Sequence, residues 1–217
     1  MGFFNNPFSM KIKVPMFFKT VIHKSLLLLM LCSLPSGCLN FKPAVDTSRF
    51  YVLRSVASSS NAERSIATPL VVGKVTLPDY MDRAPIVTLL QHGQLNISES
   101  NRWAEDITKD VTRVMVQNFI KLINSDRVAL KEQKRLDAPF YELSMTVLDF
   151  IYNTENKKVI LEAKWTIADS TKKILIEKVH KFSVPAEKDY PAIVDAMSQS
   201  LSRLCSKIIR EIELPIK

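Results

Sequence analysis

Few residues in this chain of 217 could perform catalysis, and their spacing forms no recognised constellation. Beyond residue 37 there are two histidines, His92 in a predicted turn and His180 in the middle of a predicted strand. A zinc site needs three or four ligands at workable spacing, and the sequence contains neither a CxxC nor an HxxxH pair. We therefore interpret both histidines as surface or core residues, and we expect no metal and no other cofactor.

The remaining candidates for chemistry also have simpler interpretations. Cys205 lies on the apolar stripe of a predicted helix, where a buried thiol packs as a small hydrophobic group. Glu105 and Asp106 stand in the first turn of another predicted helix, where carboxylates complement the helix dipole. Asp79, Asp82 and Arg83 cluster in the turn at Pro78, where an ion pair that stabilises the turn is favoured over a binding site. We expect no catalytic residue and therefore no enzyme.

The scarcity of glycine excludes several enzyme classes. The chain has four glycines, of which two, Gly2 and Gly37, lie close to the amino terminus. Loops that cradle phosphates need glycine where the backbone approaches the ligand closely. Gly73 and Gly93 alone cannot build a P-loop, a dinucleotide fingerprint or a nucleophile elbow.

Cys38 has the clearest chemical context. Four lysines and no acids precede an apolar run at residues 26–34, and small residues then lead to the cysteine. A basic region, a short apolar region and a small-residue cleavage site are typical of a secretory signal peptide, and the run is shorter than the roughly 20 apolar residues of a membrane span. The pattern resembles a bacterial lipobox, which implies cleavage before Cys38 and lipidation of its thiol.

Two alternatives remain open for this segment. Pro35 stands where a lipobox usually carries leucine, so an ordinary secretory signal would leave Cys38 as a free thiol able to pair with Cys205. An uncleaved anchor is the other alternative. Translation could also start at Met10 or Met16.

The predicted domain organisation is a signal peptide at residues 1–37, a lipid-anchored tether at 38–48 and one domain at 49–217. About half of the formal net charge of +8 comes from the lysines of the signal peptide. The other basic residues are scattered among acids, whereas nucleic-acid binding requires a clustered basic face with stacking aromatics. We expect no nucleic-acid partner.

The first half of the domain is predicted to contain strands at residues 49–54, 69–77, 84–90 and 94–97. A helix is predicted over residues 101–123, capped by Ser100 or Asn101. Its apolar residues recur at spacings of three and four and form one stripe: Trp103, Ile107, Val111, Val114, Met115, Phe119, Leu122 and Ile123.

The second half begins with a short strand at residues 128–130 and continues as a meander. Apolar and polar residues alternate over residues 140–150 and 159–168, which is typical of antiparallel strands covered on one face, and 174–184 is the returning strand. Asp189 is expected to cap a final helix. The predicted fold class is α+β, a mainly antiparallel sheet with two long amphipathic helices packed on one face.

Three segments together resemble one protein family: RFYVLR at 49–54, VTLPDYMDRAPIV at 75–87 and NRWAEDI at 101–107, all following Cys38. On their order and spacing, the chain is identified as a member of the ABC-type transport auxiliary lipoproteins, with the likeness spread over residues 38–215. The resemblance implies an α+β domain without catalytic residues. The positions expected to serve structure or partner contact are Pro78, Tyr80, Asp82, Arg83 and Trp103.

The resemblance also implies a location and partners. Such a lipoprotein would be held by its acyl chains at the periplasmic face of the outer membrane of a Gram-negative bacterium, contacting outer-membrane lipids through Cys38. It would serve an MCE-domain periplasmic protein and its inner-membrane transporter in lipid transport, and the resemblance also implies a homo-oligomer. The alternative is a solitary periplasmic module that binds lipid or peptide in an apolar pocket near Trp103.

Overall fold

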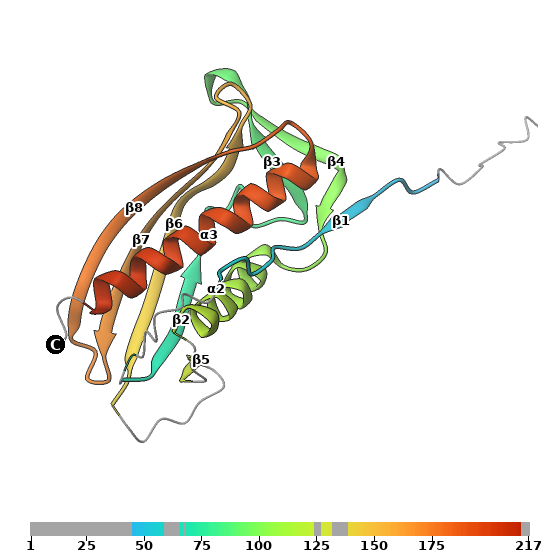
Figure 1. Cartoon of the computed structure of the whole chain (residues 1–217). Coiled ribbons are helices and arrows are strands. Elements are labelled where there is room, and N and C mark those ends of the chain that lie inside the picture. Colours follow the sequence, from blue (N-terminus) through green and yellow to red (C-terminus); the bar gives the residue numbers. More distant parts are fainter. Residues whose placement is uncertain (1–44, 59–65, 67, 124–126, 132–138, 214–217) are drawn as a thin grey trace, which may run out of the picture. The chain divides into compact units, whose positions relative to one another are not determined.

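The computed structural model of the chain describes residues 45–58, 66, 68–123, 127–131 and 139–213. The predicted signal peptide, Cys38 and most of the predicted tether lie outside the described residues. Figure 1 shows the described elements: two long helices lie on the same side of a curved sheet. All of these elements belong to one compact unit, Asp46–Lys217.

The elements follow one another in a strand-rich order with two long helices. The helices are α2 (Ile107–Ile123) and α3 (Tyr190–Glu213), with a short 3₁₀ turn, η1, at Gln91–Gly93. The strands are β1 (Arg49–Tyr51), β2 (Leu70–Thr76), β3 (Pro85–Leu89), β4 (Leu95–Trp103), β5 (Val128–Leu130), β6 (Tyr141–Asn153), β7 (Lys158–Asp169) and β8 (Ile174–Pro185).

The sheet is mixed, although most of its paired length is antiparallel. The meander of β6, β7 and β8 is antiparallel along nearly the whole of each strand, and β3 pairs antiparallel with β4. The pairs of β1 with β4, β2 with β5, β2 with β6 and β3 with β6 are parallel. The α+β class is therefore confirmed, and the sheet is more mixed than the alternation of residues suggested.

Strand β6 has two partners on the edge that faces away from β7. β2 pairs with its first half, from Tyr141 to Thr146, and β3 pairs with its end, at Tyr152 and Asn153. Between these two ladders the chain turns through residues 78–83, and β6 itself is irregular between Val147 and Asp149. The 78–83 turn therefore lies beside an interruption in the sheet.

The core lies between the sheet and the helices. Alternate residues of β7 are fully buried, among them Leu161, Trp165 and Ile167. In α2 the buried residues recur at helical spacing, and α3 contributes a similar series that includes Leu201 and Ile208. Burial of large apolar side chains at about 1.5–3 kcal/mol each is the main stabilising contribution.

Helix α2 begins six residues later than the sequence predicts. Residues 101–103 belong to β4, and Asp106 caps the helix, because its Oδ1 accepts a hydrogen bond from the Lys109 N–H at 3.0 Å. The predicted cap at Ser100 or Asn101 was wrong. Trp103 matches the period of the helix stripe, but it is the last residue of a strand. The predicted cap of α3 is confirmed, since Asp189 Oδ1 accepts from the Ala192 N–H at 2.9 Å.

Candidate functional site

The 78–83 turn is closed by its own backbone. The N–H groups of Met81 and Asp82 donate to the carbonyl of Pro78 at 2.9 and 3.2 Å, and the Arg83 N–H donates to Met81 at 2.8 Å. Met81 is buried and packs in the core cluster, so it anchors the turn. Pro78 is partly buried and acts here as the acceptor that sets the turn.

Tyr80 fixes the turn to β6. Its hydroxyl donates to Asp149 Oδ1 at 3.2 Å, at the place where the β6 ladder is irregular. Burial, reinforced by the Asp149 carboxylate, raises the pKa of Tyr80 to about 12. Burial also raises the pKa of Asp149, although the Tyr80 hydroxyl and Lys181 oppose the rise. The phenol therefore remains protonated and continues to donate.

Asp82 and Arg83 are both exposed and do not pair with each other. Among the ion pairs of the described residues, none joins these two side chains or involves Asp79. Asp82 Oδ1 instead accepts a hydrogen bond from the Thr108 hydroxyl at 3.4 Å. The predicted turn-stabilising ion pair was wrong, because Asp82 is directed towards the first turn of α2.

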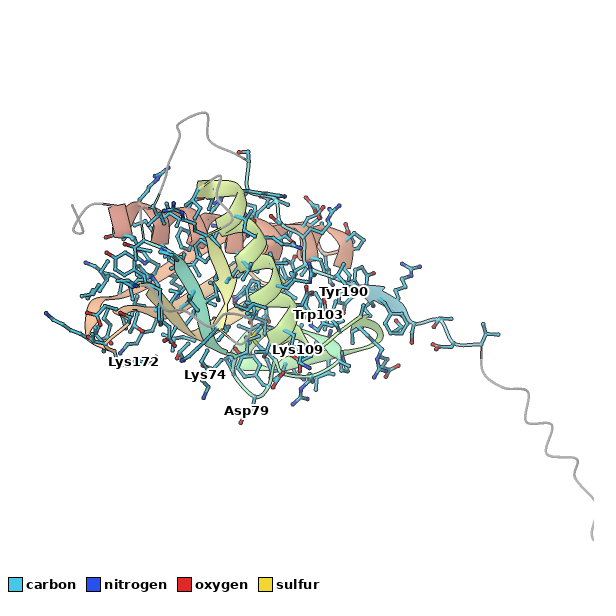
Figure 2. The ribbon with its side chains drawn as sticks, turned by 90° about the horizontal axis from the view of Figure 1, so that it is seen from below. Lys74, Asp79, Trp103, Lys109, Lys172 and Tyr190 are labelled. Atoms are coloured by element: carbon cyan, nitrogen blue, oxygen red, sulfur yellow. The ribbon has the colours of Figure 1, made fainter. Side chains whose placement is uncertain are left out.

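Trp103 is a core residue rather than an exposed contact. Trp103 is 6% exposed, and its backbone N–H donates to the Ala84 carbonyl at 2.7 Å. A small cavity of about 260 Å³ lies beside it, lined by residues 82–84 and 103–107. Trp103 is labelled in Figure 2.

A second polar arrangement involves residues 52–57, which we call the strap. The strap follows β1 and is held by side chains of both helices. The Leu53 N–H donates to Asp110 Oδ2 at 2.8 Å, and its carbonyl accepts from Arg113 at 3.2 Å. The Arg54 N–H donates to Ser198 Oγ at 3.1 Å. These helix side chains replace the strand partner that an extended segment would otherwise require.

The rest of the strap is held in the same way. Asn118 Oδ1 accepts from the Ser55 hydroxyl at 2.8 Å and from the Ala57 N–H at 3.2 Å. The Lys121 ammonium donates to the Ser55 carbonyl at 3.0 Å. Sequence reasoning missed the strap, although buried Asn118 interrupts the apolar stripe of α2 and was an available signal.

Asp110 is the fully buried carboxylate of this arrangement, with a side chain that is 0% exposed. It also forms an ion pair with Arg113, which in turn contacts Glu105 at 3.2 Å. Burial raises the pKa of Asp110, and the Leu53 N–H and the Arg113 guanidinium oppose that rise. A buried carboxylate is retained only where hydrogen bonds and an opposite charge compensate it.

A groove of about 710 Å³, which we call the basic groove, lies between α2 and the strands β2 and β5. Its apolar lining is Val72, Val75 and Leu130. Its polar and charged lining is Lys74, Glu105, Thr108, Lys109, Thr112, Arg113 and Lys131, and Gly73 also lines it. Sequence reasoning missed this groove because its cations come from three separate elements.

His92 is exposed in η1, whereas His180 and Cys205 are held by neighbouring side chains. The Trp165 indole N–H donates to His180 Nδ1 at 3.0 Å. Burial and the nearby Lys207 lower the pKa of His180, against a smaller opposing effect of Glu211. Cys205 is fully buried, and burial raises the pKa of its thiol.

Within the described ranges, no group of three or more His, Cys, Asp or Glu side chains could hold a metal ion. Over the same residues, no helix has the length and apolarity required to cross a membrane. Cys38 lies outside the described residues, so its lipidation stays a prediction.

Comparisons with known proteins give a family and a fold. Residues 51–209 match the sequence model of the family described as "ABC-type transport auxiliary lipoprotein component". The crystal structure of protein XCC0632 from Xanthomonas campestris, of family DUF330, is similar with a TM-score of 0.64 at 18% identity, over 75% of this chain and 93% of that one.

A crystal structure of an uncharacterised protein is similar to the same degree. It has a TM-score of 0.62 at 19% identity and covers 76% of this chain and 98% of its own. At these identities the structural likeness shows the fold alone. No curated protein is similar enough to this chain to match it.

Proposed function

This chain belongs to the family of ABC-type transport auxiliary lipoprotein components, and on that premise we propose that it is a non-catalytic accessory of an intermembrane lipid transport system. It would be anchored at the outer membrane and would dock the periplasmic conduit of an MCE-domain protein there. The match over residues 51–209 is the observation that carries this proposal, since it spans most of the chain.

The anchor proposed at Cys38 is consistent with this role. Each buried CH₂ of an acyl chain contributes about 0.8 kcal/mol, so a cysteine carrying several chains is held at the membrane almost permanently. The tether of residues 38–48 reaches at most about 35 Å when extended. The domain would therefore stay near the surface where lipid is delivered or collected.

Exposed apolar side chains near the start of the domain support a contact there. Phe50 is 63% exposed, and Val52 and Val56 are each 43% exposed. These three side chains come from residues 50–56, directly after the tether, where a contact with a partner or a membrane would fall in the proposed role. In the proposed role, this region meets the conduit, a second copy of the chain or the lipid surface.

The first experiment is purification of the full chain from bacterial envelopes in mild detergent, followed by mass spectrometry of the co-purifying molecules. We expect an MCE-domain protein, its inner-membrane transporter and a homo-oligomer of this chain. A monomer that brings only phospholipid would contradict the proposal and favour the solitary binding module.

The second experiment tests the anchor. Cys38→Ala should abolish labelling with radioactive palmitate and move the protein out of the outer-membrane fraction. Cys205→Ala is the matched control, because it removes the cysteine of the domain and should leave labelling unchanged. Continued outer-membrane fractionation of Cys38→Ala would show that lipidation is not what holds the protein there.

A further inference from the structure

The basic groove has two cations that are free to meet a ligand. Within the described residues, Lys74 and Lys109 have no carboxylate at ion-pair distance. Lys131, at the same groove, is paired with Glu142 at 2.5 Å. Figure 2 shows Lys74 and Lys109 on the side of the molecule away from α3, with Lys172 at a separate end.

The local backbone positions both lysines at this groove. Lys74 lies in the irregular stretch of β2, where the register to β6 shifts between Val72 and Val75. A bulge of this kind re-aims a side chain relative to its neighbours. Lys109 lies in the first turn of α2, beside the end of the helix that carries partial positive charge.

The other charged groups of the groove are already compensated. Glu105 is the one carboxylate among the lining residues, and it pairs with Arg113 at 3.2 Å. Arg113 also engages buried Asp110, so its guanidinium is occupied. The groove therefore presents positive charge through lysine ammonium groups rather than through an arginine fork.

These features select the ligand. Lysine binds phosphate as a compact point charge. The one arginine of the lining, Arg113, whose fork could recognise phosphate or carboxylate through two parallel hydrogen bonds, is already engaged by Glu105 and Asp110. The lining of Val72, Val75 and Leu130 adds an apolar wall beside the ammonium groups. A volume of about 710 Å³ is in the usual range for a small-ligand site.

We propose that the basic groove binds the phosphate headgroup of an anionic phospholipid, with the first part of an acyl chain against its apolar wall. This inference rests on the proposed function, because it identifies the cargo class that such an accessory would contact. It adds a binding site on the domain itself, distinct from the acyl chains at Cys38. Free phosphate and an acidic peptide are the competing ligands.

The test is a calorimetric titration of the full chain in mild non-ionic detergent with water-soluble dihexanoyl phosphatidylglycerol. We expect Lys74→Glu with Lys109→Glu to weaken binding by about tenfold or more, because hydrogen bonds to charged groups are among the stronger ones. The matched control is Lys158→Glu with Lys173→Glu, which changes the charge equally at exposed positions outside the groove. Equal affinities of the two double variants would overturn the proposal.

A steric variant tests the site without changing its charge. Thr108→Trp places a large side chain in the groove and should weaken binding to a similar extent. Circular dichroism and thermal melting establish that this variant is folded. A folded Thr108→Trp variant that binds the lipid as the wild type does would locate the ligand elsewhere and overturn the proposal.

Three further ligands identify what the groove recognises. Dihexanoyl phosphatidylcholine should bind more weakly than dihexanoyl phosphatidylglycerol. Inorganic phosphate should displace the phosphatidylglycerol only at a much higher concentration. Equal binding of the choline lipid, displacement by phosphate at the lipid's own concentration, or stronger binding of a glutamate-rich peptide would each overturn the proposal. If the wild-type chain binds none of these lipids while the transport partners still co-purify with it, this inference is rejected and the proposed function stands.

Discussion

The meander of β6–β8 and the strap are held in place by different interactions. In the meander, backbone groups pair with one another along long ladders, and alternate side chains such as Leu161 and Trp165 are buried against the helices. In the strap, backbone groups are met one at a time by polar side chains, among them Asp110 and Asn118. The first arrangement depends on packing and the second on individual hydrogen bonds.

This difference predicts how each region responds to mutation. Loss of one core side chain removes many contacts at once and leaves a cavity. Loss of one polar side chain that holds the strap removes a hydrogen bond whose net contribution is about 1 kcal/mol, and it adds the cost of any buried group left unpaired. The meander should therefore respond globally to mutation, and the strap should respond locally.

The largest effect is expected in the meander. Trp165 is 0% exposed, and Trp165→Ala should lower the free energy of unfolding by about 3–5 kcal/mol, since it leaves a cavity and removes the hydrogen bond to His180. Urea denaturation of the wild type and the variant measures the change. Lys164→Ala, at the exposed neighbouring position, should stay within about 1 kcal/mol. A similar loss for both variants would contradict the role of core packing.

The next effect concerns the strap. Asp110→Ala leaves the Leu53 N–H without its acceptor and Arg113 without its buried partner, so we expect a loss of about 2–3 kcal/mol. Hydrogen exchange should become faster at the Leu53 amide before it does so in β7. Glu105→Ala removes the exposed partner of the same arginine and should cost much less. Uniform acceleration across the domain would show that the strap and the core open together.

A smaller effect is expected at the seam between β2 and β6. A Cβ on Gly73 would lie 2.9 Å from Glu142 Oε1 and 3.1 Å from the Leu143 carbonyl oxygen. Gly73→Ala should therefore displace the Glu142 carboxylate from its ion pairs and cost about 1–2 kcal/mol. Thermal melting measures this loss. Gly93→Ala is a poor control because φ is positive there, so Ser183→Ala, at an exposed strand position, is preferable.

The smallest effect is a pH dependence at His180. Because its pKa is lowered in the folded state, the neutral ring that accepts the Trp165 N–H stabilises the fold above the ordinary pKa of 6.5. This contribution decreases as the pH falls below 6.5 and is lost once the pH passes the lower, folded-state pKa. Melting temperatures from pH 7.5 to 5 should show the decrease, and His180→Gln should flatten it. An unchanged slope in His180→Gln would assign the pH dependence to other groups.

The same comparison explains what could be predicted from the sequence. The alternation in residues 140–150 and 159–168 reports one buried face, which is what β6 and β7 have. The cap at Asp189 depends only on local geometry and was also predictable. The order of motifs such as RFYVLR and NRWAEDI was sufficient to indicate the family that the match over residues 51–209 shows.

The remaining features depend on which segments meet in space. Alternation cannot distinguish a parallel partner from an antiparallel one, so the pairs of β2 with β6 and β1 with β4 were not predicted. Trp103 satisfies the helical period by position alone, and its pairing with Tyr51 assigns it to a strand. The basic groove joins Lys74 to Lys109 across a distance in sequence that no local pattern spans.

The strap also determines how a mechanical load would pass into the domain. If Cys38 is the point of attachment, a pull between membrane and domain acts first on β1, whose ladder with β4 joins only residues 49–51 to 101–103. The load then reaches the Leu53 contacts with Asp110 and Arg113, and only afterwards the large core. Under tension, the β1–β4 ladder and the hydrogen bonds of the strap would therefore break one after another. The released residues would lengthen the tether while the meander remained folded.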